Sequence, residues 1–223
     1  MLFSELYKSL NNNELEEFYK SVFMNMDGEK AEEARCLYYK QKLRHMGENV
    51  KIGRSVKIIN PQFISIGNDV TINNDCTLIA RGEAGIRIAD KVELKDRVYL
   101  DTEYTDGYIH IGKAVYIGTG CTLHGHKGLE IMEDTMLAQN VTITPYSHIF
   151  EDSTQPIKKQ GGHCRKITIE KDCYIGKCTC ILYSADIHEG SVIGSGSVVV
   201  KSIPPYSVAV GVPAKVIRKR GRQ

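Results

Sequence analysis

One histidine of the chain stands in a stretch that differs from its surroundings. His148 lies near the start of TPYSHIFEDSTQPIKKQGGHC, residues 144–164, where a regular spacing of aliphatic residues stops for about twenty positions. An imidazole titrates near neutral pH, so it can take a proton from a hydroxyl or amine during group transfer. Glu151 and Asp152 follow closely and are candidates to orient the ring or to bind a substrate hydroxyl. The alternative interpretation of His148 is a solvated histidine on a surface loop.

Few other side chains are candidates for catalysis or metal binding. His124 and His126 form a histidine pair upstream of His148. Cys178 and Cys180 form a CxC pair without a second pair at a suitable spacing, which does not predict a metal site. We see no serine or cysteine triad, and we expect no metal.

The composition excludes some classes of protein. The chain has 29 Lys and Arg against 27 Asp and Glu, so no overall field predicts binding to nucleic acid or to a membrane surface. No stretch approaches the roughly 20 apolar residues of a membrane span, and MLFSELYKSL lacks the apolar run of a signal peptide. Seven cysteines, an odd number, indicate reduced thiols and a cytoplasmic location.

Aliphatic residues recur every six positions along most of the chain. The sets are Ile66, Ile72, Leu78; Ile88, Leu94, Leu100; Ile111, Ile117, Leu123; Ile131, Leu137, Ile143; and Ile169, Ile175, Ile181, Ile187, Ile193, Val199. Glycine often follows, and a small or β-branched residue stands four places later, giving [LIV]-G-x-x-[STAVC]-x. Six residues suit a short strand plus a tight corner, for which we expect glycine to supply the backbone conformation. Because stacked coils bury a continuous column, the repeat predicts an all-β fold, a parallel β-helix.

The interruptions of this spacing are also regular. Each extra segment follows the third hexapeptide of a set, after Leu78, Leu100, Leu123 and Ile143. Three strands of six residues make one turn of a triangular prism, so all insertions should leave the same edge. By the same argument Leu123 lies one coil from Ile143, about 4.8 Å away. His124 and His126 are therefore expected near the point where the His148 loop leaves.

The first residues have a different pattern. NNNELEEFYKSVFMN predicts a helix capped by Asn12 or Asn13, and a second helix is expected from about Gly28 to Met46. Such helices can cover the open end of the first coil. We therefore divide the chain into a helical cap at 1–48, a β-helix at 49–212 with a protruding loop at 144–166, and a basic tail at 213–223.

Three features together resemble a known family. One is the repeat. The second is the ending SVIGSGSVVVKSIPPYSVAVGVPAKVIRKR, residues 191–220, and the third is the loop, where His148-Ile-Phe-Glu-Asp152 precedes Pro-Ile-Lys and Gln-Gly. They resemble the hexapeptide-repeat acyltransferases, within them the sugar O-acetyltransferase branch related to galactoside and maltose acetyltransferases. Tyr146 stands where many members have a second histidine. The resemblance covers about residues 50–220 and implies a left-handed helix.

The resemblance implies an acetyl-CoA-dependent enzyme that acetylates a saccharide hydroxyl directly. His148 would be the general base, and the acceptor would contact His126, His124, Tyr146, Glu151 and Asp152. The donor would lie along the C-terminal coils at Gly176, Lys177 and Ser195. Its phosphates would meet Lys201, Lys215 and Arg218, and its adenine Pro213 and Ala214. The implied assembly is a homotrimer with sites between subunits.

Other functions stay open at this point. One is an N-acetyltransferase acting on a nucleotide-linked amino sugar. A second is a zinc hydratase that resembles trimeric carbonic anhydrases, with His124, His126 and His148 as ligands; its histidine spacing differs from the one found here, and it lacks the GVPAK ending. A third is a scaffold without activity. The alternative interpretation of His124 and His126 is exposed turn residues.

Overall fold

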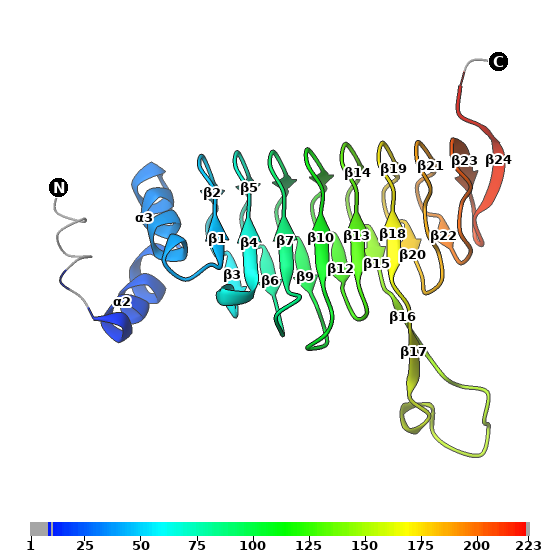
Figure 1. Cartoon of the computed structure of the whole chain (residues 1–223), viewed down its shortest axis with the longest axis horizontal. Coiled ribbons are helices and arrows are strands. Elements are labelled where there is room, and N and C mark those ends of the chain that lie inside the picture. Colours follow the sequence, from blue (N-terminus) through cyan, green and yellow to red (C-terminus); the bar gives the residue numbers. More distant parts are fainter. Residues whose placement is uncertain (1–8, 10, 222–223) are drawn as a thin grey trace.

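The chain winds into a three-sided column of short parallel strands. The computed structural model describes residues 9 and 11–221 of the chain. Figure 1 shows the strands stacked along the long axis, with helices at one end and β24 at the other. The predicted parallel β-helix is confirmed, because neighbouring strands in each face come from successive turns.

Three sheets form the faces of the column. The first contains β1 (His45–Met46), β4 (Ile64–Ile66), β7 (Ile86–Ile88), β10 (Ile109–Ile111), β13 (Leu129–Ile131) and β18 (Ile167–Ile169). The second contains β2 (Lys51–Ile52), β5 (Thr71–Ile72), β8 (Glu93–Leu94), β11 (Tyr116–Ile117), β14 (Met136–Leu137), β19 (Tyr174–Ile175), β21 (Val192–Ile193), β23 (Ser207–Val210) and β24 (Lys215–Lys219). The third contains β3 (Lys57–Ile59), β6 (Thr77–Ile79), β9 (Tyr99–Asp101), β12 (Thr122–His124), β15 (Thr142–Ile143), β20 (Cys180–Ile181) and β22 (Val198–Val199).

The aliphatic residues of the repeat fill the interior. Leu100, Leu123 and Ile143 occupy equivalent positions in successive strands of the third sheet and are fully buried. Fully burying such a side chain contributes about 1.5–3 kcal/mol, so a stack of identical positions along the axis stabilises the column at every turn. The predicted register of Leu123 with Ile143 is confirmed.

The glycines of the repeat have a different role from the one we predicted. Gly67 and Gly112 are absent from the residues with positive φ, whereas Asp69 and Ala114, two places later, have φ of 57° and 56°. A Cβ at Gly112 would lie 2.6 Å from the amide nitrogen of Glu133 in the next coil. Glycine is therefore required because the neighbouring coil approaches closely, not because the corner needs its φ.

Helices cover the open end of the first coil. They are α2 (Asn12–Phe18), the π-helix η1 (Tyr19–Phe23) and α3 (Glu29–Lys40). The cap of α2 is Asn11, not Asn12 or Asn13; its side chain accepts from the amides of Asn13 and Glu14. The second helix is shorter than predicted, because it ends at Lys40 and His45–Met46 already pairs with β4.

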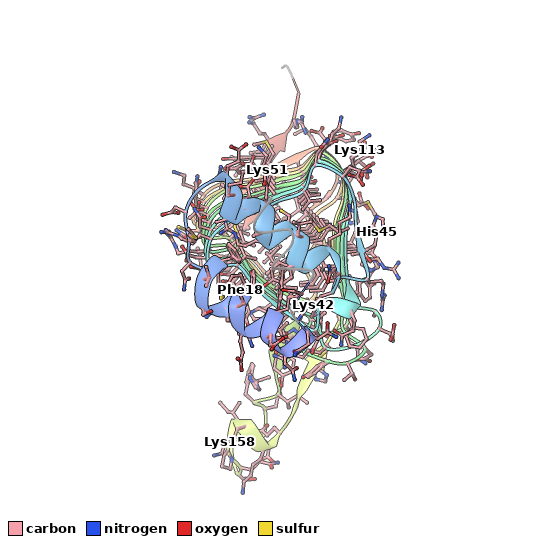
Figure 2. All side chains as sticks on the ribbon, turned by 90° about the vertical axis from the view of Figure 1, so that its left-hand side faces the viewer. Phe18, Lys42, His45, Lys51, Lys113 and Lys158 are labelled. Carbon is pink, nitrogen blue, oxygen red and sulfur yellow. The ribbon has the colours of Figure 1, made fainter. Side chains whose placement is uncertain are left out.

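One buried cation joins this cap to the column. The Arg35 guanidinium donates to the carbonyls of Ile52, Phe23 and Met26 at 2.8–2.9 Å. It thus supplies hydrogen-bond donors to backbone carbonyls where the helical cap meets the first coil. In the end-on view of Figure 2 the helices lie across the mouth of the column.

Part of the basic tail, Lys215–Lys219, forms the strand β24. β24 pairs antiparallel with β23, and the Arg220 guanidinium bonds to Asp172 and to the carbonyl of Gly190. None of the helices in the described residues has the length and apolar character needed to cross a membrane.

Candidate active site

The stretch that interrupts the repeat leaves the column as a hairpin arm. β16 (Tyr146–His148) pairs antiparallel with β17 (Gly162–Cys164), and the 3-10 turn η3 (Ile157–Lys159) lies between them. Figure 1 shows the arm projecting from the column, and Figure 2 shows Lys158 at its far end. The shorter insertions after β6, β9 and β12 follow strands of the same sheet, so they leave the same edge, as predicted.

Asp152 is used to fold the tip of the arm. Its carboxylate accepts from the amide and hydroxyl of Thr154 and from the Gln155 amide, at 2.6–2.9 Å. These donors hold the pKa of the Asp152 carboxyl below its usual range. Glu151 accepts from the amide of Phe150 at 3.0 Å. Within the described part of the chain neither carboxylate bonds to His148, so neither orients it in a single subunit.

His148 contacts a tyrosine at the base of the arm. The His148 Nδ1 atom lies 3.2 Å from the Tyr146 hydroxyl, and their rings are nearly perpendicular with centroids 4.7 Å apart. The His148 side chain is exposed. This contact leaves Nε2 accessible to an incoming hydroxyl group.

Tyr146 connects His148 to the two upstream histidines. Its ring stacks on that of His126, with centroids 5.1 Å apart and an interplanar angle of 18°, and the His126 and His124 centroids are 5.8 Å apart. We call His124, His126, Tyr146 and His148 the aromatic row. The sequence proposed all four as site residues, and the structure brings them together in one chain.

His126 has the most unusual environment in the row. It is a non-glycine residue with φ of 21°, it is 8% exposed, and its buried Nδ1 has no partner in the part of the chain that the structure describes. Burial lowers the pKa of its imidazole. Tyr104 packs edge-on against it, at 5.3 Å between centroids. Strained backbone and an unpaired buried atom concentrate at functional sites.

A glycine makes room for this conformation. A Cβ at Gly107 would lie 2.5 Å from the His126 carbonyl oxygen. The 102–108 insertion and the turn that carries His126 can pack together only with glycine there.

An acidic cluster that the sequence analysis missed supports the row. The Asp101 carboxylate is buried and accepts from Arg81 Nε at 2.9 Å, from Arg81 Nη2 at 2.7 Å and from the Tyr99 hydroxyl at 3.0 Å. It also accepts from the Glu103 amide at 2.7 Å, and Glu103 Oε1 in turn lies 2.8 Å from His124 Nδ1. The chain of contacts thus runs from Arg81 to an imidazole of the row.

The ionisation of this cluster is fixed by its own contacts. Burial raises the pKa of Asp101, but the bonds from Arg81, the Glu103 amide and Tyr99 outweigh burial and hold that pKa below its usual value. Burial beside Asp101 raises the pKa of Tyr99 to about 12, so its hydroxyl remains a donor. The one-coil argument used for Leu123 and Ile143 could have found Asp101 and Glu103, since both follow Leu100.

The residues proposed for the donor lie elsewhere on the column. Gly176 and Ser195 follow strands of the second sheet, and a Cβ at Gly176 would lie 2.5 Å from the Ser195 amide. Lys177 accepts at its carbonyl from Gly196 at 2.7 Å. These residues occupy the edge between the second and third sheets, whereas the arm leaves the edge between the third and first. One subunit therefore does not bring them to His148.

The C-terminal members of that set lie near the last coil. Ala214 donates its amide to the Val198 carbonyl at 2.8 Å, and Pro213 precedes it. Lys201, Lys215 and Arg218 are exposed. No cluster of three or more His, Cys, Asp or Glu side chains suited to a metal occurs among residues 9 and 11–221.

Comparison with known proteins gives a consistent result. No family model matches the chain. It is 30% identical over 185 residues to a dTDP-4-amino-4,6-dideoxy-D-glucose acyltransferase of Escherichia coli, covering 81% of this chain and 84% of the relative. It is 36% identical over 112 residues to the galactoside O-acetyltransferase of Escherichia coli K12, covering 50% of this chain and 54% of the relative. The chain thus spans about half the length of several curated relatives.

Solved structures share the fold. The N-acyltransferase AntD from Bacillus cereus, in complex with dTDP and 3-hydroxybutyryl-CoA, superposes with a TM-score of 0.62. The match covers 89% of this chain and 92% of AntD at 24% identity.

Proposed function

The chain belongs to the hexapeptide-repeat acyltransferases, and we propose that it transfers an acetyl group from acetyl-CoA to a hydroxyl of a saccharide. The observation that carries this proposal is the arm, which holds His148 against Tyr146 and, through Tyr146, beside His126. A base next to a row of polar aromatic groups suits deprotonation of a bound sugar. The acceptors named for two relatives, a dTDP-linked amino sugar and a galactoside, support a saccharide acceptor.

The reaction proceeds by direct transfer. His148 takes the proton of the acceptor hydroxyl while its oxygen attacks the thioester carbon. As the tetrahedral adduct collapses, the carbon–sulfur bond breaks and the imidazolium returns the proton to the CoA thiolate. Such a base contributes about 10²–10⁴ in rate, and holding donor and acceptor together supplies much of the remainder.

The acceptor binds at the aromatic row and the donor at the C-terminal coils. In this proposal Gly176, Lys177 and Ser195 contact the pantetheine arm. Lys201, Lys215 and Arg218 meet the phosphates as exposed cations, and Pro213 and Ala214 border the adenine. Glu151 stays a candidate acceptor contact, whereas Asp152 is engaged by Thr154 and Gln155.

The enzyme acts as a homotrimer in this proposal. Gly176, Lys177 and Ser195 lie on a different edge of the column from the arm, so in this proposal a complete site combines the arm of one subunit with the donor edge of another. The exposed Phe150 and Ile157 on the arm, 62% and 53% accessible, are suited to such a contact. A cytoplasmic location fits the seven free cysteines.

A thiol-release assay tests the activity. The purified protein is incubated with acetyl-CoA and a panel of mono- and oligosaccharides and nucleotide-linked amino sugars. We expect CoA release that requires a sugar hydroxyl, with an acetyl ester found by mass spectrometry. If the only product is an amide on amino sugars, the acceptor group is an amine and not a hydroxyl. Zinc-dependent hydration of CO₂ without any acyl transfer would overturn the proposal.

Gly162 offers a second test, because it packs against the ring that links the row. A Cβ at Gly162 would lie 2.5 Å from Tyr146 Cε2 and closer still to Cζ and the hydroxyl. We expect Gly162→Ala to displace Tyr146 from His126 and to lower kcat/KM for the acceptor about tenfold or more, because small displacements from productive geometry reduce rates strongly. Steady-state kinetics measure this change.

The control for this substitution is Ser153→Ala on the same arm, away from the row. It should leave kcat/KM unchanged. If Gly162→Ala is as active as the unmodified enzyme, the assignment of Tyr146 to the acceptor site is contradicted.

A further inference from the structure

Two imidazoles of the aromatic row have opposite hydrogen-bonding roles. His124 Nδ1 lies 2.8 Å from Glu103 Oε1. An ionised carboxylate only accepts, so the hydrogen of a neutral His124 ring resides on Nδ1. Its Nε2 then carries a lone pair and acts as an acceptor.

His126 has the reverse arrangement. Its Nδ1 is buried and lacks a partner among the described residues. A hydrogen on that atom would be a buried donor without an acceptor, which is rarer and more costly than an unpaired acceptor. The neutral ring therefore carries its hydrogen on Nε2, and burial, which lowers the pKa of His126, favours this neutral form.

Neither Nε2 atom is fully buried, so each can meet a ligand in this inference. Neither atom belongs to the buried, unpartnered atoms of the described residues, and neither makes a hydrogen bond there. The two rings have centroids 5.8 Å apart. Tyr146 and Tyr104 hold the His126 ring from two directions, and Glu103 holds His124. The pair therefore offers one acceptor and one donor side by side.

We propose that His124 and His126 bind two neighbouring hydroxyls of the acceptor, and that Glu103 is the positioning residue that sets their complementary roles. This inference rests on the proposed saccharide acetylation and specifies its acceptor as a vicinal diol. One hydroxyl donates to His124 Nε2 and its neighbour accepts from His126 Nε2–H. A carboxylate cannot donate to His124, and an ammonium cannot accept from His126, so the pair selects hydroxyls over charged groups.

The support of Glu103 is itself rigid. Its amide donates to the buried Asp101 carboxylate, which Arg81 holds with two bonds. The same insertion also carries Asp106, an exposed acid that pairs with Lys127. Asp106 is therefore a matched control: it is an acid in the same segment, it pairs with Lys127, and within the described residues it has no hydrogen bond or ion pair with either histidine.

The first test measures the tautomers without any substrate. Long-range ¹⁵N–¹H correlation spectra of histidine-labelled enzyme should show His124 protonated at Nδ1 and His126 at Nε2. Glu103→Gln should shift His124 toward protonation at Nε2, because the amide side chain can donate to Nδ1, and should leave His126 unchanged. Asp106→Asn should alter neither. Identical tautomers at His124 and His126 in the unmodified enzyme would overturn the proposal.

The second test measures recognition of the diol. Glu103→Gln should raise KM for the acceptor about tenfold or more, because the acceptor hydroxyl would then face a donor at His124 Nε2 and the two donors would be left unpaired, while KM for acetyl-CoA stays constant and kcat changes less. A deoxy acceptor lacking the neighbouring hydroxyl should lower kcat/KM by a similar factor in the unmodified enzyme but cause no further loss in Glu103→Gln.

The outcomes separate the two proposals. If the deoxy acceptor lowers kcat/KM equally in the unmodified enzyme and in Glu103→Gln, the positioning role of Glu103 is contradicted, whereas saccharide acetylation is not. If no saccharide is acetylated, both the proposed function and recognition of a vicinal diol are contradicted. The tautomer spectra then still show whether His124 and His126 carry their hydrogens on different ring nitrogens.

Discussion

Replacement of His148 by alanine is expected to lower kcat by about 10²–10⁴. Within the described residues the imidazole hydrogen-bonds only to the Tyr146 hydroxyl, and its side chain is exposed, so its loss removes proton transfer without creating a buried cavity. Acetyl-CoA binding should be retained, because His148 is not among the residues proposed to contact the donor. Turnover is measured by thiol release, and donor binding by calorimetry.

His163→Ala is the matched control for this substitution. His163 lies on β17, opposite Ser147 in the hairpin register, and is also exposed. The control should keep full activity. If His148→Ala turned over at the original rate, the base would have to be His124 or His126.

Leu123→Ala is expected to lower the free energy of unfolding by about 2–5 kcal/mol. Leu123 is completely buried and lies in register between Leu100 and Ile143, so its truncation leaves a cavity that the rigid coils on both sides cannot fill. Urea unfolding at a fixed protomer concentration measures the change, with the m-value unaltered.

Val200→Ala serves as the comparison, because Val200 follows β22 and is 40% exposed. Its unfolding free energy should change by less than about 0.5 kcal/mol. A similar loss in both variants, or a loss below 1 kcal/mol in Leu123→Ala, would show that the interior is not packed as a continuous column.

The location of the arm and of the upstream histidines followed from the spacing of the repeat. Because each turn buries the same positions, a residue's neighbours lie one turn away in sequence, and the pairing of Leu123 with Ile143 could be counted directly. The same arithmetic placed His124 near the origin of the His148 loop. In this fold the period of the repeat predicts which residues lie next to each other in adjacent coils.

Side-chain contacts within the insertions could not be counted in this way. The sequence proposed Asp152 as a partner of His148, but its carboxylate bonds to Thr154 and Gln155. Glu103 was not proposed, yet it holds His124. These contacts depend on side-chain rotamers and on non-repetitive backbone, for which neither period nor propensity gives a rule.

The sequence by itself therefore determined the column, the edge that carries the loops and the histidines gathered there, because a hexapeptide period makes long-range contacts regular. Only the tertiary structure decided which side chains pair and which do not: Arg81 with Asp101, Glu103 with His124, and no partner for His126 Nδ1 among the described residues. Hydrogen bonds need specific distances and directions between atoms, and a repeating pattern of residue types specifies only which faces are buried.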